Sequence, residues 1–124
     1  MRGLAIYSEE PRTRMVETEG LEDYYDIIGC RYIDIVEVSI GRRVFNLIVD
    51  DEGMLVQSPR FTVLSKRYPN LWGLAGTVIA YGESDDRDLC DLTAEDLKVL
   101  RDNIEMVVEA DGRNVTIHPM LLVD

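Results

Sequence analysis

The alternation of apolar and polar positions divides the first part of the chain into short strands and a loop. Residues 2–7 have the length and composition of a first strand, and residues 15–18 could form a second, shorter one. Pro11 and the polar residues around it predict a turn or loop over residues 8–14. The chain is therefore expected to begin with two strands joined by this loop.

A helical period follows in residues 20–28. Apolar side chains recur there at the spacing of one helix face, at Leu21, Tyr24, Tyr25 and Ile28. Gly29 comes next, and glycine commonly ends a helix because it adopts left-handed backbone angles at little cost. The pattern predicts a short helix that ends at Gly29.

The next segments have the period of a strand. Residues 30–40 and residues 44–49 are both predicted to be strands, and the short link between them favours an antiparallel hairpin. Residues 50–53 end in a glycine and predict a further turn, after which residues 54–56 can pair back. Together these segments predict a three-stranded meander.

The middle of the chain has a weaker pattern. Residues 57–72 contain Pro59 and Pro69 and are expected to be irregular, although residues 61–64 could form a helical turn or a short strand. Residues 77–81 have the composition of a strand. Five acidic residues in nine positions then predict an acidic loop over residues 83–91.

The clearest helical pattern begins at Thr93, a favourable N-cap with Asp96 in the position of a capping box. One apolar face continues to about residue 110, through Leu97, Leu100, Ile104, Val107 and Val108. The tail over residues 114–124 could be a last strand or a docking segment for a partner. We therefore expect an α+β fold: an antiparallel sheet with a short N-terminal helix and a longer C-terminal helix, in a single acidic domain over residues 1–124.

Charge narrows the range of partners. The 124 residues include 13 Lys and Arg against 24 Asp and Glu, a net charge of −11, and 46% of them are apolar, which suffices for one core. Binding to duplex nucleic acid or to an anionic membrane needs clustered cations, so neither is expected. The excess of acidic residues is unevenly distributed along the chain, because residues 68–124 hold 12 acidic and 4 basic residues.

The chain carries no recognisable targeting segment. No apolar run approaches the length of a membrane-spanning helix, and the N-terminal residues lack the apolar stretch and cleavage site of a secretory signal. Cys30 and Cys90 are too few and too far apart in sequence for a disulfide framework. We therefore expect a cytoplasmic protein.

Groupings typical of catalysis or of cofactor binding are missing from the sequence. His118 is the single histidine and has no metal-ligand partners at suitable spacing, and the acidic loop lacks the glycine and spacing of a calcium loop. Neither a phosphate-binding glycine motif nor a nucleophile motif occurs. We therefore expect no catalytic residue, no metal and no cofactor, and a protein that is not an enzyme.

Two groups of side chains remain as candidate binding surfaces, although either could be a merely solvated part of the exterior. The first is acidic and would bind a protein: Glu83, Asp85, Asp86, Asp88 and Asp91. The second combines cations with aromatic rings and would bind a small anion: Arg60, Lys66, Arg67, Tyr68 and Trp72.

Several segments occur in an order that carries a resemblance. They are Ile27-Ile28-Gly29, Tyr32-Ile33-Asp34-Ile35-Val36, Val49-Asp50-Asp51-Glu52-Gly53, Gly76-Thr77-Val78-Ile79-Ala80-Tyr81-Gly82 and Asp91-Leu92-Thr93. Over residues 20–100 the chain resembles a family of small domains of unknown function found in phages, plasmids and conjugative elements. Its pattern runs V-G-G-Y-I-E, V-D-E-E-G and G-T-V-V-V-V-G before a final L-T helix, and here Gly29-Cys30 replaces the glycine pair. The resemblance implies a mobile-DNA context and assigns no catalytic residue.

Two hypotheses of function follow. The first is a small, non-enzymatic accessory protein of a mobile genetic element that binds a host protein with a basic surface, in the manner of a DNA mimic or an anti-defence protein. The second is a binder of a small anionic ligand such as a nucleotide signal, with the cations on phosphate and the rings stacked on a base.

Overall fold

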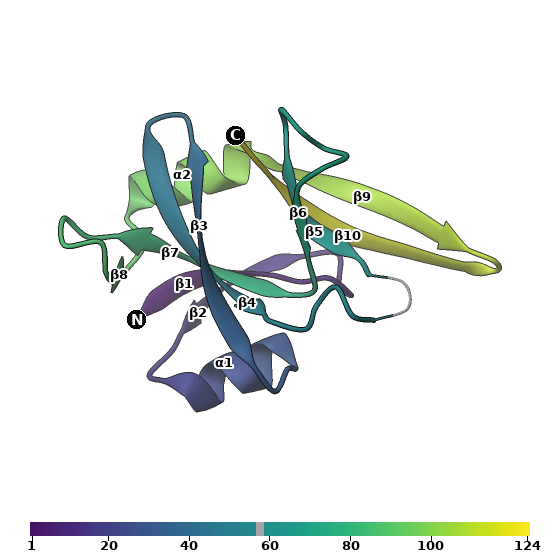
Figure 1. The fold of residues 1–124 in the computed structure, drawn as a ribbon, viewed down its shortest axis with the longest axis horizontal. Coiled ribbons are helices and arrows are strands. Elements are labelled where there is room, and N and C mark those ends of the chain that lie inside the picture. Colours follow the sequence, from purple (N-terminus) through teal and green to yellow (C-terminus); the bar gives the residue numbers. More distant parts are fainter. Residues whose placement is uncertain (57–58) are drawn as a thin grey trace.

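The strands of the molecule form two sheets, and two short helices lie against them (Figure 1). The computed structural model describes residues 1–56 and 59–124. Residues 57 and 58, at the start of the segment expected to be irregular, lie outside the described residues. Strands account for 49% of the described residues and helices for 14%. The protein is therefore mostly β structure.

The first sheet is antiparallel throughout. Its strands run in the order β2-β1-β7-β4-β3, and a short β8 pairs with the end of β7. The bounds are β1 Arg2–Ile6, β2 Thr13–Glu17, β3 Ile33–Ile40, β4 Arg43–Asp50, β7 Val78–Glu83 and β8 Leu89–Cys90. The central position of β7, between β1 and β4, joins the two halves of the chain in one sheet.

The second sheet has the order β6-β5-β10-β9. Its strands are β5 Phe61–Ser65, β6 Gly73–Ala75, β9 Ile104–Asp111 and β10 Asn114–Val123. Strands β9 and β10 form a hairpin, whereas β10 and β5 run parallel and pair only at residues 121–123 of β10. The outer part of the hairpin therefore extends beyond the rest of its sheet (Figure 1).

Alternating side chains of the first sheet face two different cores. On one face Leu4, Phe45 and Leu47 pack with residues of the second sheet and of α2 (Ala94–Asp102). On the other face Ala5, Ile48 and Tyr81 pack with α1 (Leu21–Ile28). The first sheet thus lies between α1 and the layer that the second sheet and α2 form (Figure 1).

Several local predictions are confirmed. Helix α1 ends at Gly29, whose φ of 73° is left-handed. Strands β3 and β4 form the expected antiparallel hairpin around Gly41. Thr93 caps α2 through the predicted capping box, because its side chain accepts from the N–H of Asp96 while the Asp96 carboxylate accepts from the N–H of Thr93.

The expected α+β fold with a longer C-terminal helix is wrong. Helix α2 ends at Asp102, and residues 104–111 form strand β9 instead of its continuation. Ile104 and Val108 are four residues apart. Residues with this spacing lie on the same face in a helix and also in a strand. At the end of α2 the Asn103 side chain donates to the carbonyl oxygen of Val99 at 2.8 Å, and the chain then turns into the hairpin.

The three-stranded meander is also wrong in its third strand. Residues 54–56 form turns and bends, and β7 occupies the place beside β4 where they were expected. Of the open alternatives, residues 61–64 belong to strand β5 and residues 114–123 to strand β10. Among the described residues, no helix has the length and apolar character needed to cross a membrane.

Candidate functional site

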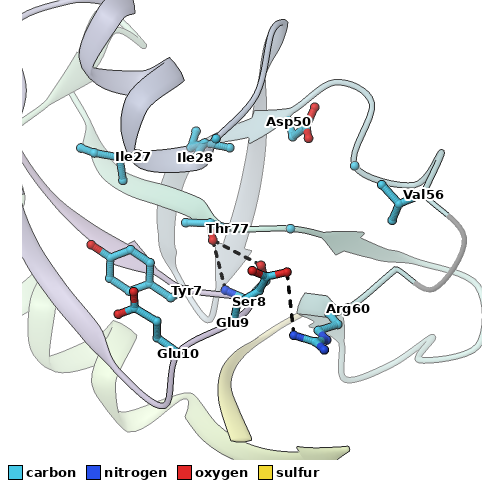
Figure 2. Close-up of a pocket in the computed structure, with 13 residues that line it drawn as sticks. Tyr7, Ser8, Glu9, Glu10, Ile27, Ile28, Asp50, Val56, Arg60 and Thr77 are labelled. Carbon is cyan, nitrogen blue, oxygen red and sulfur yellow. Dashed lines mark hydrogen bonds and ion pairs between the residues drawn. The ribbon is translucent and has the colours of Figure 1, made fainter. Parts of the chain in front are cut away.

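One cavity lies where four separate segments meet. It has a volume of about 560 Å³ and lies between the loop after β1, the end of α1, the loop after β4 and the turn before β7 (Figure 2). Its lining consists of Tyr7, Ser8, Glu9, Glu10, Ile27, Ile28, Gly29, Asp50, Gly53, Val56, Arg60, Gly76 and Thr77. Three segments that carry the family resemblance thus contribute to one cavity, at residues 27–29, 50–53 and 76–77.

Glycines allow these segments to approach one another closely. A Cβ at Gly53 would lie 2.5 Å from the carbonyl oxygen of Ala75, so only glycine fits there without a backbone shift. Gly76 has a φ of 89°, a conformation that residues with a side chain rarely adopt. Thr62 donates its hydroxyl to the carbonyl oxygen of Gly76 and fixes this turn.

Carboxylates outnumber cations around the cavity. The lining residues include three acids, Glu9, Glu10 and Asp50, and one cation, Arg60. Arg60 lies 3.9 Å from Glu9, whereas Glu10 forms an ion pair with Arg12, which is not part of the lining. Figure 2 shows Arg60 next to Glu9, with Asp50 across the cavity. Because the lining has net negative charge, it would repel a phosphate and favours an uncharged or cationic occupant.

Hydrogen bonds and stacked cations hold the loop after β1 in place. The Ser8 N–H donates to the Thr77 hydroxyl at 3.1 Å, and the two hydroxyls lie 3.3 Å apart. The guanidinium groups of Arg12 and Arg14 lie 5.5 and 5.8 Å from the centre of the Tyr7 ring. The cavity wall on this side is therefore built by the fold and needs no ligand to form.

The structure does not bring the predicted basic and aromatic residues together. Arg60 lines the cavity of about 560 Å³ beside Tyr7. Tyr68 and Trp72 line a different cavity, of about 390 Å³, beside Val123. The Lys66 ammonium donates to the side-chain oxygen of Asn103 at 2.6 Å, and Arg67 is exposed. The five residues therefore do not form one anion site.

The predicted acidic residues lie on one hairpin, formed by β7 and β8. Its turn, residues 84–88, is closed by Ser84, which donates its N–H to the carbonyl oxygen of Asp88 and accepts the N–H of Arg87, both at 2.9 Å. Asp85, Asp86 and Asp88 are exposed in this turn. We call residues 84–88 the β7–β8 turn.

The other two predicted acids serve the fold. A carboxylate oxygen of Asp91 accepts from the N–H of Arg2 at 2.7 Å. Glu83 is half-buried, and partial desolvation together with the neighbouring carboxyl of Glu37 raises its pKa. Among the described residues, Asp85, Asp86 and Asp88 thus remain as the exposed members of the set whose carboxylates form no hydrogen bond or ion pair with the rest of the fold.

Ion pairs neutralise the acidic residues at the start of α2 but not those of the turn. Arg43 contacts both Glu95 and Asp96 at 2.7 Å, and these contacts raise its pKa further. In the described part of the chain, no cation lies within 4.0 Å of the carboxylates of Asp85, Asp86 or Asp88. The β7–β8 turn, which also contains the exposed Arg87, therefore carries a net charge of −2 that no ion pair among the described residues compensates.

No metal-binding cluster of three or more His, Cys, Asp or Glu side chains occurs within residues 1–56 and 59–124. His118 is completely buried; its Nδ1 lies 3.0 Å from the carbonyl oxygen of Pro119. Its Nε2 lies 3.4 Å from a carboxylate oxygen of Glu109 without hydrogen-bond geometry. His118 is therefore a buried histidine with a hydrogen-bond partner at one ring nitrogen and no metal-binding cluster around it among the described residues.

Of the residues that line the cavity, sequence reasoning named only Arg60 as a candidate binding residue. Tyr7 and Ser8 carry no recognisable motif, and Thr77, their neighbour in space, is distant from them in sequence. The available signal was the placement of glycines at positions 53 and 76, which marks close approach of two backbones but does not say which.

Comparison with known proteins places the chain in a family whose description names no catalytic activity. No curated protein matches it, and no solved structure does. One family model matches residues 1–112, which is most of the chain. The chain therefore belongs to the family described as Domain of unknown function (DUF3846).

Proposed function

We propose that this domain is a non-enzymatic accessory protein that binds a partner protein with a basic surface. The observation that carries the proposal is the β7–β8 turn, where Asp85, Asp86 and Asp88 are exposed and have no cation within ion-pair distance among the described residues. Exposed, unpaired carboxylates attract a cationic surface and accelerate the encounter with it.

The charge of the whole chain supports the same partner. The net charge is −11, and residues 68–124, which include the turn, hold 12 acidic against 4 basic residues. A field of one sign directs a basic partner toward this part of the molecule. The same field disfavours duplex DNA and RNA as direct ligands.

The resemblance to domains of phages, plasmids and conjugative elements supplies a biological setting. In that setting the partner is a cytoplasmic host protein whose basic groove normally holds nucleic acid, and the domain occupies the groove as a DNA mimic or anti-defence protein. The carboxylates of the turn take the place of phosphates in this proposal.

The alternative, a binder of a small anionic ligand, has less support. Arg60 is separated from Lys66, Arg67, Tyr68 and Trp72, and the cavity that it lines also holds three carboxylates. A phosphate there would meet more negative than positive charge.

The test is a capture experiment with a variant that removes the charge of the turn. The immobilised domain and its Asp85→Asn/Asp86→Asn/Asp88→Asn variant are exposed to bacterial lysate at about 0.05 and 0.5 M NaCl, and bound proteins are quantified by mass spectrometry. We expect nucleic-acid-binding proteins that the unmodified domain retains at low salt and that the variant loses.

The matched control changes the same number of charges elsewhere. Glu19→Gln/Glu22→Gln/Asp26→Asn neutralises three exposed acids in and beside α1 and should keep the captured proteins. Purified candidates are then tested for displacement of a DNA duplex by the domain. Equal capture by the turn variant and the unmodified domain would contradict the proposal.

A further inference from the structure

The β9–β10 hairpin has apolar side chains on its exposed face. Met106 and Val108 of β9 are 50% and 64% exposed, and Val115 and Ile117 of β10 are 66% and 44% exposed. The register pairs Val108 with Ile117 and Ala110 with Val115, so these side chains lie on one face of the hairpin. An exposed apolar patch of this kind is typical of an interaction surface.

The same strand has an open edge. Strand β9 ends the order β6-β5-β10-β9, so nothing in the described part of the chain pairs with its outer side. Pro119 has no N–H and pairs with Met106, which makes this a non-hydrogen-bonded pair. The N–H and C=O groups of Met106 and Val108 therefore point away from β10 and are available to an added strand.

Charge on the opposite face specifies what can be added. Glu105 is exposed and Glu109 is half-exposed, and both alternate with the apolar residues along β9. A strand laid against this edge would place one set of its side chains beside Met106 and Val108 and the other set beside the two glutamates. The complementary segment alternates apolar residues with lysine or arginine.

A second copy of the chain paired antiparallel about Val107 does not meet this requirement. If two β9 strands paired antiparallel about Val107, Glu105 of one copy would lie opposite Glu109 of the other. Like charges directly opposite each other destabilise a strand pair. In this register the edge is therefore complementary to a cationic strand and not to itself.

We propose that the outer edge of β9 binds an extended apolar-basic segment of a partner protein as an added strand of the second sheet. Backbone hydrogen bonds to Met106 and Val108 supply affinity, and the alternation of apolar and cationic side chains supplies selectivity. This site is separate in the chain from the β7–β8 turn and does not depend on it.

The test uses a defined peptide of eight residues in which lysine and valine alternate, with both termini blocked. Binding is followed by titration of the isotope-labelled domain in NMR and by calorimetry. We expect saturable binding, shift changes concentrated in residues 104–110, and slower hydrogen exchange at the N–H groups of Met106 and Val108. A peptide in which glutamate replaces lysine should not bind.

Variants of β9 separate the parts of the proposal. Val108→Lys puts a cation on the apolar face and should weaken binding at least about tenfold, whereas Val108→Thr keeps the branched shape and should weaken it only a few fold. Glu105→Gln should weaken binding and reduce its salt dependence. Val108 is exposed, so each variant is expected to fold, which thermal unfolding checks.

The outcomes distinguish this site from the proposed function. The Asp85→Asn/Asp86→Asn/Asp88→Asn variant should bind the lysine-valine peptide at β9 as the unmodified domain does. Shift changes confined to the β7–β8 turn, equal binding of the glutamate peptide, or a dimer in sedimentation that Val108→Lys abolishes would each overturn the proposal.

Discussion

At the scale of single residues, the interior of the first sheet depends on Tyr81. Its side chain is the largest among those that are completely buried, and its hydroxyl forms a hydrogen bond with the hydroxyl of Thr18. The ring lies edge-on to Tyr24 of α1, with ring centres 6.1 Å apart. Burial, followed by smaller effects that include the neighbouring Tyr24, raises the pKa of the Tyr81 phenol above its ordinary value.

Tyr81→Phe should lower the free energy of unfolding by about 1 kcal/mol near neutral pH, because it removes this hydrogen bond and keeps the ring. The substitution should also make the free energy of unfolding less dependent on pH in alkali. Since the pKa is higher in the folded than in the unfolded state, the folded protein keeps the proton while the unfolded chain loses it, and stability falls as pH rises above about 10. Phenylalanine cannot contribute to that fall.

Urea unfolding at several pH values between about 8 and 11 measures both effects. The control is Tyr32→Phe, at a side chain that is 58% exposed and therefore similarly solvated in both states. It should reproduce the alkaline slope of the unmodified protein. An unchanged slope in Tyr81→Phe would show that the buried phenol does not cause the loss.

Gly53 determines how closely the loop after β4 packs on the turn before β7. A Cβ there would meet the carbonyl oxygen of Ala75 at 2.5 Å, and backbone cannot move aside as a side chain can. We expect Gly53→Ser to cost about 1–3 kcal/mol. Gly20→Ser is the matched control, because a Cβ at Gly20 meets nothing within 4 Å and serine is a favoured residue at this N-cap.

Thermal unfolding of the two serine variants gives the comparison. A destabilised Gly53→Ser beside an unchanged or stabilised Gly20→Ser would establish close backbone packing as the cause. If both variants unfold at the temperature of the unmodified protein, the loop after β4 relaxes more easily than its contacts indicate.

At the scale of elements, strand β9 has hydrogen-bonding groups that alternate in their direction. In the pairing with β10, Val107 and Glu109 belong to hydrogen-bonded pairs, and Met106 and Val108 do not. We expect the N–H groups of Val107 and Glu109 to exchange with solvent about ten times more slowly, or slower still, than those of Met106 and Val108. Hydrogen exchange followed by NMR measures each amide.

Equal exchange along β9 would contradict this arrangement. A helical continuation of α2 would protect all four amides alike, because every N–H inside a helix bonds to a carbonyl four residues earlier. The alternating pattern is therefore a direct test of the element that the sequence did not predict.

The elements that local chemistry specifies were predictable, and those that depend on distant partners were not. Gly29 and Thr93 mark helix ends by their own conformational or capping preferences, and the structure confirms both. The short link between residues 40 and 44 likewise predicted the hairpin that turns at Gly41. Strand β9 was read as helix because Ile104 and Val108 suit either period, and only its pairing with β10 decides between them.

The candidate site shows the same division. The acidic residues of the β7–β8 turn are neighbours in sequence, so their grouping survives in the structure. Of the basic and aromatic residues, Arg60 precedes β5 and the other four follow it, so the strand separates Arg60 from the cavity that Tyr68 and Trp72 line. The cavity beside Tyr7 combines four segments that only the order of the sheet brings together.

At the scale of the whole molecule, the net charge of −11 acts against the folded state. Folding gathers the carboxylates into a smaller volume, so their mutual repulsion is greater than in the unfolded chain. At about 0.01 M salt the screening length is about 30 Å, comparable to the diameter of a domain of this size, whereas at 0.15 M it is about 8 Å. Repulsion across the molecule is therefore strong only at low salt.

We expect the free energy of unfolding to rise when NaCl is increased from about 0.01 to 0.15 M. Salt also weakens exposed ion pairs such as Arg43 with Glu95, but pairs of this kind contribute at most about 1 kcal/mol each. Because acidic residues outnumber basic ones by 24 to 13, the relief of repulsion should exceed that loss. Urea unfolding at fixed pH and increasing NaCl measures the net effect.

The variant Asp85→Asn/Asp86→Asn/Asp88→Asn tests whether the β7–β8 turn is a main source of the repulsion. It lowers the net charge from −11 to −8 without removing a contact of less than 4.0 Å to any described cation. Its stability at low salt should be higher than that of the unmodified protein, and its gain on adding salt should be smaller. If the protein instead loses stability as salt is added, attraction between its charges outweighs repulsion. The β7–β8 turn could then not be the uncompensated patch of negative charge that the proposed binding to a basic partner requires.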